Sequence, residues 1–307
     1  MPLRFTFRQL EYLVAVADAG TIAAASHRIN VSSPSISAAI SQVETELGIQ
    51  IFVRHHAQGL SLTPGGRRLV GEARDILDRA AALTDLAGDI TEKVRGPITI
   101  GALSTVAPIL SAALRRSFEA AFPEARVSLR SGNQVDLLQM LGRAEIDVAL
   151  TYDLEIPKNI AFEQLAKLPP YVMLPAKHPM VSQGEASLKS LVEEPMVLLD
   201  LPLSREYFLS MFHNSQLRPD IAERTTDLSV ARSLVANGFG FSLVNLRMPS
   251  ATAPDGAPLA FLPLKDRVRP MVLGLATKQA THRSGVVQAF FDHTAQQVRR
   301  SALPGMA

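Results

Sequence analysis

The sequence predicts a mixed α/β protein in three parts: a small helix-rich N-terminal domain, a long connecting helix, and a larger C-terminal domain of two α/β lobes. Three observations lead to this prediction. Residues 21–47 have the pattern of two short helices around a tight turn, and residues 65–94 carry apolar side chains at alternating spacings of four and three. From residue 97 onward, strand-like and helix-like runs alternate. A chain of 307 residues, 47% of them hydrophobic, is long enough for two or three such domains.

The first helix is expected to begin after Thr6, because Thr6 and Gln9 have the spacing of a capping box. Gly20 is expected to end it, since glycine adopts the left-handed conformation common at helix C-termini. Its apolar face consists of Leu10, Leu13, Val14 and Ala17.

A second helix is expected to open at Thr21, and residues 30–34 have the composition of a tight turn. Ser32 then caps a third helix that Gly48 ends. The apolar side of this third helix is predicted at Ile36, Ile40, Val43 and Leu47. Two short helices joined so closely expose the second one as a rod that fits the major groove of DNA.

Two short strands are expected next, at residues 51–54 and 60–63, around a hairpin loop at residues 55–59. Thr63 and Pro64 then suit the start of another helix, because threonine caps helices and proline fits their first position. Residues 1–64 are therefore predicted to form a winged helix-turn-helix DNA-binding domain.

These motifs resemble the winged helix-turn-helix of the LysR-type transcriptional regulators. The resemblance is carried by residues 7–10, 24–25, 31–37, 44–48 and 62–66, and in its layout it extends over nearly the whole chain. Two positions depart from the family pattern, which commonly has glutamine at Ser33 and a basic residue at Ala38. Residues 32–43 carry no charge, so base readout by serine is expected to be modest; the alternative is that these serines only solvate an exposed helix.

DNA contacts are predicted for residues of both helices, the turn and the wing. They are Thr21, Arg28, Ser32, Ser33, Pro34, Ser35, Ser37, Ala38, Ser41, Gln42, Arg54 and His55. Residues 1–68 hold six arginines and four acidic residues, a net charge of only +2. Because affinity for phosphates grows with the number of contacts neutralised, a single copy is expected to bind weakly and an oligomer to bind through avidity.

The connecting helix, residues 65–95, is predicted to be a dimer interface with an apolar seam. Its candidate residues are Leu69, Ala73, Ile76, Ala80, Leu83, Ala87 and Ile90. The resemblance to the family implies the same role. The alternative is a helix docked on its own domain. Residues 95–97 are expected to end the helix and to form the hinge to the next domain.

The C-terminal domain, residues 96–300, is predicted to have two α/β lobes, of which the first is a βαβαβ unit with a parallel sheet. Lobe I is placed at residues 96–163 and 268–300, and lobe II at residues 164–267. The strands are expected at residues 98–101, 126–130 and 147–151, then at 171–174, 196–199 and 241–244, and finally at 271–276 back in lobe I. The helices are expected near residues 108–121, 134–143, 187–193, 204–213 and 228–237, with a last one ending near 299. This layout resembles the effector domain of the family, which is similar to type 2 periplasmic binding proteins.

Ligands of open α/β sheets bind beyond the carboxyl ends of the strands. The residues there are Ser104, Thr105, Asn133, Tyr152, Asp153, Pro202, Ser204, Arg205 and Asn245. Arg205 is a candidate carboxylate clamp, although Asp153 would repel a carboxylate unless it pairs with Arg205 across the cleft. The alternatives are helix-capping roles for Ser104 and Ser204, a partly buried Tyr152 and a solvated Arg205.

Composition excludes several other functions. The chain has no cysteine, so it has no disulfide, thiol nucleophile or cysteine metal site, and no enzyme motif of the HExxH, GxSxG or phosphate-loop type occurs in it. No cofactor or metal is expected. The first residues lack an apolar signal core, and the uncharged segment 96–114 is broken by proline and glycine, so a cytoplasmic protein without a membrane segment is expected.

The sequence therefore predicts a LysR-type regulator, not an enzyme, whose binding to promoter DNA responds to a small molecule between two lobes. Its expected partners are double-stranded DNA, a small-molecule effector and further copies of itself as a dimer or tetramer, with RNA polymerase as a further candidate. One alternative is a two-lobed binding protein or enzyme of the same fold, and another is an architectural DNA-binding protein.

Overall fold

The structure is a computed structural model that describes residues 4–55, 59–90, 94–279 and 283–300. At residues 54, 55, 78, 81, 82 and 84–90 it describes the backbone alone. The chain forms two compact units, Met1–Lys93 and Val94–Ala307, hereafter unit 1 and unit 2. Each unit has its own hydrophobic core, and that of unit 2 is divided between two lobes.

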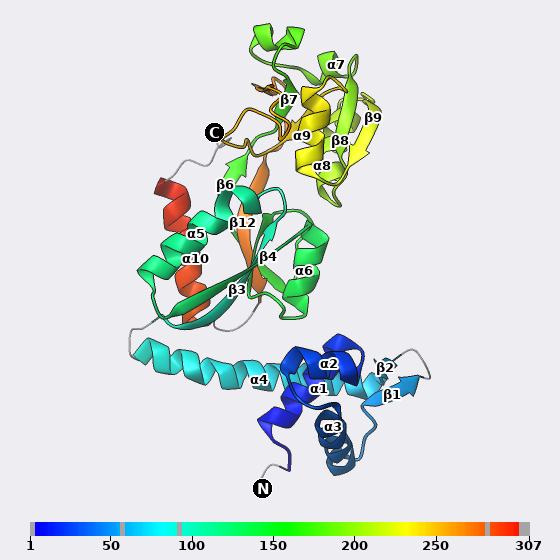
Figure 1. Cartoon of the computed structure of the whole chain (residues 1–307), viewed down its shortest axis with the longest axis vertical. Coiled ribbons are helices and arrows are strands. Elements are labelled where there is room, and N and C mark those ends of the chain that lie inside the picture. The colour runs from blue at the N-terminus through cyan, green and yellow to red at the C-terminus, as the bar shows by residue number, and fades with distance from the viewer. Residues whose placement is uncertain (1–3, 56–58, 91–93, 280–282, 301–307) are drawn as a thin grey trace. The chain divides into compact units, whose positions relative to one another are not determined.

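Unit 1 consists of helices around a short hairpin (Figure 1). Its elements are α1 (Phe7–Ala19), α2 (Ile22–Ile29), α3 (Ser33–Leu47), β1 (Phe52–His55), β2 (Gly59–Leu62) and α4 (Pro64–Ile90). The capping box predicted for α1 is confirmed, because the Thr6 and Gln9 side chains each accept the other residue's backbone N–H. Gly20 ends α1 in the left-handed conformation, as predicted.

The turn between α2 and α3 is shorter than the sequence suggests. Asn30 ends α2 in the left-handed conformation with φ of 57°, and Ser32 caps α3, whose first residue is Ser33. Ser33 and Pro34 therefore belong to the helix and not to the turn. The predicted apolar face is correct for Ile36, Ile40 and Val43, which are buried. It is wrong for Leu47, because this residue lies in the last turn of α3 and is 37% exposed.

The apolar residues that were predicted to form the dimer interface of α4 lie in two different environments. Ala73 is buried in the core of unit 1 and Leu69 packs against that core, so these two residues were wrongly assigned to a free interface. For the first turns of α4, the alternative of a helix docked on its own domain is therefore correct. Ile76 and Leu83 instead lie on the surface. The side chains of Ala87 and Ile90 lie outside the described residues.

One carboxylate ties α4 to the other helices of unit 1. The Asp18 side chain is 8% exposed and accepts hydrogen bonds from Arg28 of α2, at 3.2 Å, and from Arg74 of α4. A carboxylate removed from water in this way needs cationic partners, because burying an unpaired charge is strongly unfavourable. Asp18 thus fixes three helices relative to one another.

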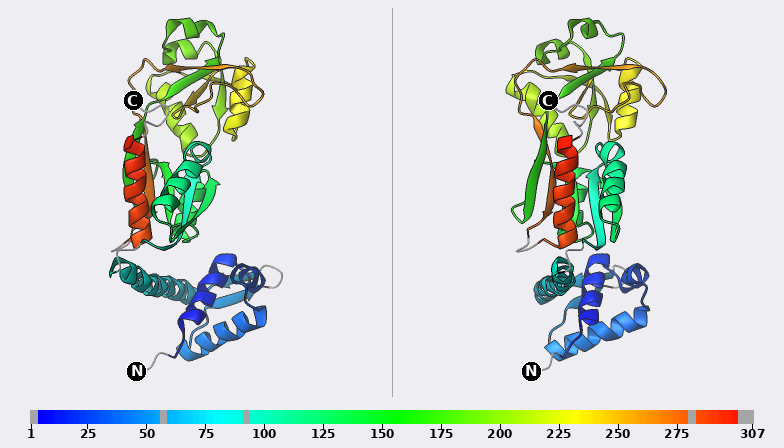
Figure 2. Two further views of the ribbon diagram at one scale, coloured as in Figure 1. Left: turned by 60° about the vertical axis from the view of Figure 1, so that its left-hand side comes forward. Right: turned by 90° about the vertical axis from the view of Figure 1, so that its left-hand side faces the viewer.

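Lobe I of unit 2 is a five-stranded sheet with the order β4-β3-β5-β12-β6. Its strands are β3 (Gly96–Leu103), β4 (Ala125–Gly132), β5 (Val148–Tyr152), β6 (Ile160–Leu168) and β12 (Met271–Lys278). The predicted parallel βαβαβ unit is confirmed in β3, β4 and β5, and β12 joins them as expected, antiparallel to β5 and β6. Helices α5 (Ala107–Ala121) and α10 (Gly285–Arg300) cover one face and α6 (Gln134–Gly142) covers the other (Figure 2).

Lobe II has a three-stranded antiparallel sheet, β10-β7-β11, and a parallel pair, β8-β9. Its strands are β7 (Tyr171–Pro175), β8 (Pro195–Leu199), β9 (Asp220–Thr225), β10 (Ser242–Val244) and β11 (Leu259–Pro263). Its helices are α7 (Leu188–Leu191), α8 (Ser204–Asn214) and α9 (Leu228–Ala236), with a 3-10 helix, η1 (Pro179–Gln183). Strands β6, β9 and β11 were not predicted.

The chain passes between the lobes later than predicted. Strand β6 pairs with β12 as far as Leu168, so the first crossing falls after Leu168 and not at residue 163. The expected hinge at residues 95–97 is also wrong in part. Gly96 and Pro97 belong to β3, where they pair with Ala125 and Arg126. A residue held in a sheet ladder has lost the backbone freedom that a hinge needs.

The uncharged segment 96–114 forms strand β3, a turn and the first half of α5, as expected from its prolines and glycines. Among the described residues, no helix has both the length and the apolar character that a membrane span requires.

We predict that Asp18→Asn loosens unit 1, because the neutral side chain leaves Arg28 and Arg74 without a counter-charge. The expected loss is about 1–3 kcal/mol in the free energy of local opening. Hydrogen exchange of the α1 and α4 amides in the full chain measures it. Glu72→Gln, at an exposed position of α4, is the control and should exchange like the wild type. Equal protection in Asp18→Asn and wild type would contradict the role given to Asp18.

Candidate DNA-binding surface and effector cavity

Residues 32–43, which cap and form most of α3, present small and polar side chains without charge. Six of the predicted DNA contacts in this segment are exposed: Ser32, Pro34, Ser35, Ala38, Ser41 and Gln42. Ser33 and Ser37 are half-buried. Hydroxyl and amide groups of this kind reach base edges by hydrogen bonding, whereas phosphate attraction requires cations from other elements.

Three of these side chains also form hydrogen bonds within the unit. The Ser32 and Ser35 hydroxyls lie 2.7 Å apart at the start of α3, and the Gln42 amide oxygen accepts a hydrogen bond from the Gln9 amide nitrogen at 2.9 Å. These bonds hold side chains of the α3 surface in defined positions, which is what sequence-specific contacts require.

The predicted cationic contacts are fewer than expected. The Arg28 guanidinium donates to the carboxylate of Asp18 and to the backbone oxygen of Ala15, at 3.2 and 3.3 Å, so its charge is already compensated. Thr21 caps α2 by accepting the Ala24 N–H at 3.1 Å. The side chains of Arg54 and His55 lie outside the described residues.

Glu44 positions the wing, a role that the sequence did not reveal. Its carboxylate accepts the backbone N–H groups of Ile51 and Phe52, at 2.7 and 3.1 Å, at the start of β1. The hairpin also packs closely against the rest of unit 1 at Gly66, where an added Cβ atom would lie 2.1 Å from the Ile51 backbone oxygen. Both residues belong to motifs of the sequence, but only their contacts show that they hold the wing.

In unit 2, a cavity lies where the two lobes meet, and we call it the interlobe cavity. Four of the nine predicted effector residues line it: Thr105, Tyr152, Ser204 and Asn245. They lie after β3, at the end of β5, at the start of α8 and after β10, as expected for the carboxyl ends of strands. Leucine, valine, methionine and phenylalanine side chains form the rest of the lining. Its volume of about 30 Å³ has room for about two water molecules.

The other five predicted residues do not line this cavity. They are Ser104, Asn133, Asp153, Pro202 and Arg205. Ser104 donates its backbone N–H to Gly132 at 3.0 Å and does not cap α5, which begins at Ala107 without a side-chain cap. The Asn133 side chain caps α6 by accepting the Asp136 N–H at 3.0 Å.

Asp153 and Arg205 do not pair across the cleft, because each has other partners. Asp153 pairs with Arg269 and accepts the Val272 N–H at 3.0 Å. Arg205 pairs with Asp200 at 2.8 Å and with Glu206 at 2.7 Å, both close to it in the chain. Hydrogen bonds from Arg205, with a smaller contribution from Arg224, lower the pKa of Asp200 despite partial desolvation.

Tyr152 is an uncharged hydroxyl in the cavity wall. Its burial raises the pKa of the phenol to about 12, partly offset by a hydrogen bond with Thr105. Gln134 is buried and donates to the backbone oxygens of Tyr152, at 3.1 Å, and of Leu154. Gln134 therefore holds the end of β5 that places the hydroxyl.

Asn245 joins the cavity to the crossings between the lobes. Its side chain is 4% exposed, and its amide nitrogen donates to the Leu168 backbone oxygen at 2.8 Å and to the Tyr207 hydroxyl at 3.4 Å. The Tyr207 hydroxyl in turn donates to the Arg269 backbone oxygen at 2.7 Å. The Asn245 amide oxygen is buried and has no hydrogen-bond partner among the described residues.

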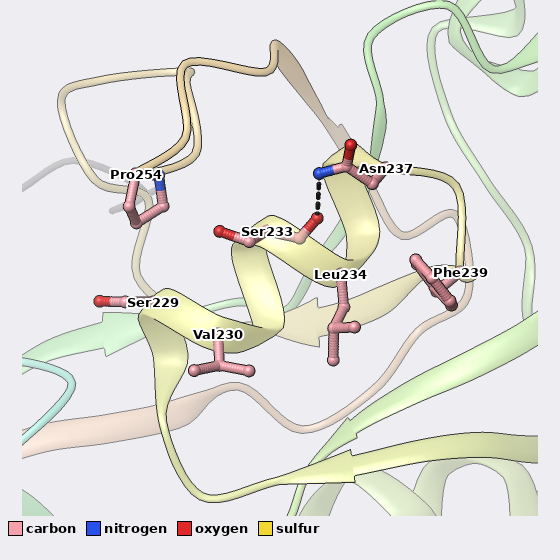
Figure 3. A pocket seen from close by; sticks show the side chains of 7 residues that line it. All are labelled: Ser229, Val230, Ser233, Leu234, Asn237, Phe239 and Pro254. Carbon is pink, nitrogen blue, oxygen red and sulfur yellow. Dashed lines mark hydrogen bonds between the residues drawn. The ribbon is translucent and has the colours of Figure 1, made fainter.

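A second hollow lies on α9 in lobe II (Figure 3). It is a shallow surface bordered by Val230 and Phe239, which are about half exposed. Its main amide is already bonded, because the Asn237 nitrogen donates to Ser233 at 2.9 Å and to Asp255 at 2.6 Å. The interlobe cavity, which is less open and is lined by polar groups of both lobes, is the better candidate for an effector site. Among the described residues, no cluster of ligating side chains suits a metal ion.

A winged helix-turn-helix joined to a two-lobed cavity-forming unit defines a DNA-binding regulator with a ligand-binding domain. The family model for the LysR substrate binding domain matches residues 91–299, and that for the bacterial regulatory helix-turn-helix protein of the lysR family matches residues 7–67. The chain therefore belongs to the LysR family and is a LysR-type transcriptional regulator.

Solved structures and relatives agree with this membership. The crystal structure of HinK, a LysR family regulator from Pseudomonas aeruginosa, is 32% identical with a TM-score of 0.65, and the match covers 96% of this chain and 99% of HinK. A hydrogen peroxide-inducible genes activator of Dickeya chrysanthemi is 28% identical over 258 residues, covering 83% of this chain and 84% of the relative. Full-length CbnR, solved in complex with its target DNA, shares the fold at 24% identity and a TM-score of 0.55, with 96% of this chain and 99% of CbnR covered.

We predict that Ala38→Arg tightens DNA binding, because it adds a cation to the exposed, uncharged surface of α3. One new phosphate contact should gain on the order of 1 kcal/mol and steepen the salt dependence by about one ion. Fluorescence anisotropy against salt concentration measures both. Ala120→Arg, an exposed position of α5 in unit 2, adds the same charge as a control. If both variants have the same slope as the wild type, α3 does not face the duplex.

Proposed function

We propose that this regulator places α3 in the major groove of its promoter DNA, binds as a homo-oligomer through α4, and changes its DNA binding when a small molecule fills the interlobe cavity. The observation that carries the proposal is the cavity itself, whose lining combines the hydroxyls of Thr105, Tyr152 and Ser204 and the amide of Asn245 with apolar side chains. A regulator that acts on promoter DNA works in the bacterial cytoplasm, and RNA polymerase is the further partner that promoter action requires.

The exposed residues of α3 support the DNA-binding half of the proposal. A helix-turn-helix reads bases with the exposed side of its second helix, and the exposed side of α3 carries serine and glutamine. The same fold in CbnR has been solved on its target DNA. With a net charge of only +2 over residues 1–68, one copy gains little from phosphate contacts. Avidity between linked copies supplies the affinity that a single unit lacks.

Exposed apolar residues on α4 support self-association. Leu83 is 67% exposed and Ile76 is 40% exposed, although the first turns of the same helix are buried in unit 1. Apolar side chains of this size on one helix are stabilised when a second copy covers them. The part of α4 beyond Ala73 is therefore the proposed dimer contact.

A ligand in the interlobe cavity acts through thermodynamic linkage, that is, through its different affinities for different arrangements of the lobes. A molecule that touches Thr105 and Tyr152 of lobe I and Ser204 and Asn245 of lobe II binds best to the arrangement in which the lobes approach. Only such differential affinity shifts a population of conformations. The residues of the cavity thus make lobe closure depend on the ligand.

Thiol chemistry is not the signal in this protein. One relative is named for induction by hydrogen peroxide, but the present chain has no cysteine and cannot form a disulfide or a sulfenic acid there. Reversible binding of a small molecule is the remaining mode of sensing that the cavity supports.

We predict that Leu83→Asp converts oligomers into smaller species, because a charge in the proposed contact must be desolvated without a partner. Sedimentation velocity at micromolar concentration measures the change, and operator affinity should fall with it. Gly71→Asp, where an added side chain meets open space on the same helix, should leave the oligomer intact. A Leu83→Asp protein that sediments like the wild type would refute the α4 interface.

The effector response is predicted to depend on Tyr152 and Thr105 and not on Arg205. Tyr152→Phe and Thr105→Val each remove a hydrogen-bonding hydroxyl and should weaken effector binding up to about tenfold. Arg205→Ala should retain the response, since Arg205 pairs with neighbouring carboxylates. Footprinting of DNA flanking the protein's own gene, with and without compounds selected by thermal shift, tests both halves. Loss of the response only in Arg205→Ala would place the sensor elsewhere.

A further inference from the structure

The polar groups in the interlobe cavity are all uncharged. They are the hydroxyls of Thr105, Tyr152 and Ser204 and the amide of Asn245. Tyr152 stays neutral at physiological pH because burial holds its pKa at about 12. Among the described residues that form the lining, none is acidic or basic.

The charged residues that directly follow Tyr152 and Ser204 in the chain are already compensated. Arg205 follows Ser204 directly, and its guanidinium is shared between Asp200 and Glu206, at 2.8 and 2.7 Å. Arg224 makes a second contact with Asp200 at 3.1 Å. Asp153 follows Tyr152 and pairs with Arg269. A charged ligand would have to compete with these pairs to gain a counter-ion.

The N-terminus of α8 is also occupied. Helix N-termini attract anions through their unpaired N–H groups. In α8, the carboxylate of Glu206 lies at this N-terminus. Desolvation raises the pKa of Glu206, but hydrogen bonds from Arg205 and from the backbone N–H groups of Glu206 and Leu203 have the larger combined effect, so its pKa is lowered. A carboxylate of the protein therefore already compensates the helix dipole beside Ser204.

One group in the wall lacks a partner. The Asn245 amide nitrogen is engaged with Leu168, so its geometry is fixed, and the amide oxygen remains as a buried acceptor. A buried acceptor without a donor is costly, and a ligand that donates a hydrogen bond to it gains affinity. The surrounding leucine, valine and phenylalanine side chains favour an apolar body on that ligand.

We infer that the effector is a small uncharged molecule with an apolar body and one N–H or O–H donor, which Asn245 receives. The inference rests on the proposed function, that is, on the interlobe cavity being the effector site. An ion of either sign would be buried among neutral groups without a partner, which disfavours it. Because the cavity volume is only about 30 Å³, side chains of the lining must move aside as the ligand enters.

Isosteric triads that differ in charge test this inference. Benzyl alcohol, benzoate and benzylamine form one triad, and butanol, butyrate and butylamine form another. Binding to the full chain is measured by thermal shift and then by calorimetry. Within a triad, the alcohol should bind at least tenfold more tightly than either ion. An ion that binds more tightly than its alcohol, or triads in which no alcohol binds, would overturn the inference.

A charge placed in the wall provides the matched variant. Ser204→Asp adds a carboxylate at the first position of α8, where the helix tolerates an acid, and it should reverse the preference so that the amine binds more tightly than the alcohol. Ser229→Asp makes the same change in the exposed first turn of α9 and should keep the wild-type order. Unchanged selectivity in Ser204→Asp would overturn the inference.

The two proposals fail in different ways. If an ion binds best and Tyr152→Phe and Ser204→Asp alter its affinity, the cavity is the effector site and only the ligand class is wrong. If bound compounds are indifferent to both variants, the cavity is not the site and the proposed function itself fails.

Discussion

The antiparallel pairing of β12 with both β5 and β6 is the constraint on which the sensing unit depends. The chain leaves lobe I along β6 and re-enters along β12, and these two strands are hydrogen-bonded from Ile160 to Leu168. Lobe II is thus carried by two adjacent segments that cannot separate without breaking the sheet. The cavity lies beside these crossings, and Asn245 and Tyr207 bond directly to their ends, at Leu168 and Arg269. Any change in the cavity therefore bears on the segments that set the angle between the lobes.

In the proposed function, charge pairing within lobe II limits what the interlobe cavity can recognise. Arg205 pairs with Asp200 and Glu206, five residues and one residue away in the chain, and so it cannot reach across to lobe I. Because neighbouring residues neutralise the charges at the rim, ligand selectivity depends on the shape of the cavity and on single hydrogen bonds. A ligand that cannot form such a hydrogen bond leaves a buried polar group unpaired, and this cost excludes it more effectively than attraction selects the correct ligand. The Asn245 amide oxygen is such a group. A neutral cavity also makes sensing insensitive to salt, whereas DNA binding by the same chain depends on it.

Local sequence signals predicted most of the helices and strands. They could not predict which side chains and elements contact one another. The caps at Thr6 and Ser32 and the glycines at the ends of α1 and α3 act within a few residues, so sequence spacing identifies them. Apolar spacing on α4 identified a helix but not its partner, because Ala73 suits its own core as well as a second chain. Strand β9 escaped prediction because its outward residues are polar and exposed. The ion pairs of Arg205 and Asp153 depend on rotamers and distances that no spacing encodes.

The low net charge of residues 1–68, only +2, is consistent with regulation by a ligand. One of their six arginines, Arg28, pairs with Asp18, so part of this small positive charge stabilises the fold and is not available for phosphates. Affinity must then come from linked copies, and the gain from linkage depends steeply on whether both copies reach their half-sites. A domain that bound tightly alone would stay on DNA whatever the effector did. If one copy binds weakly, as we propose, a modest change in the geometry between copies is enough to change occupancy.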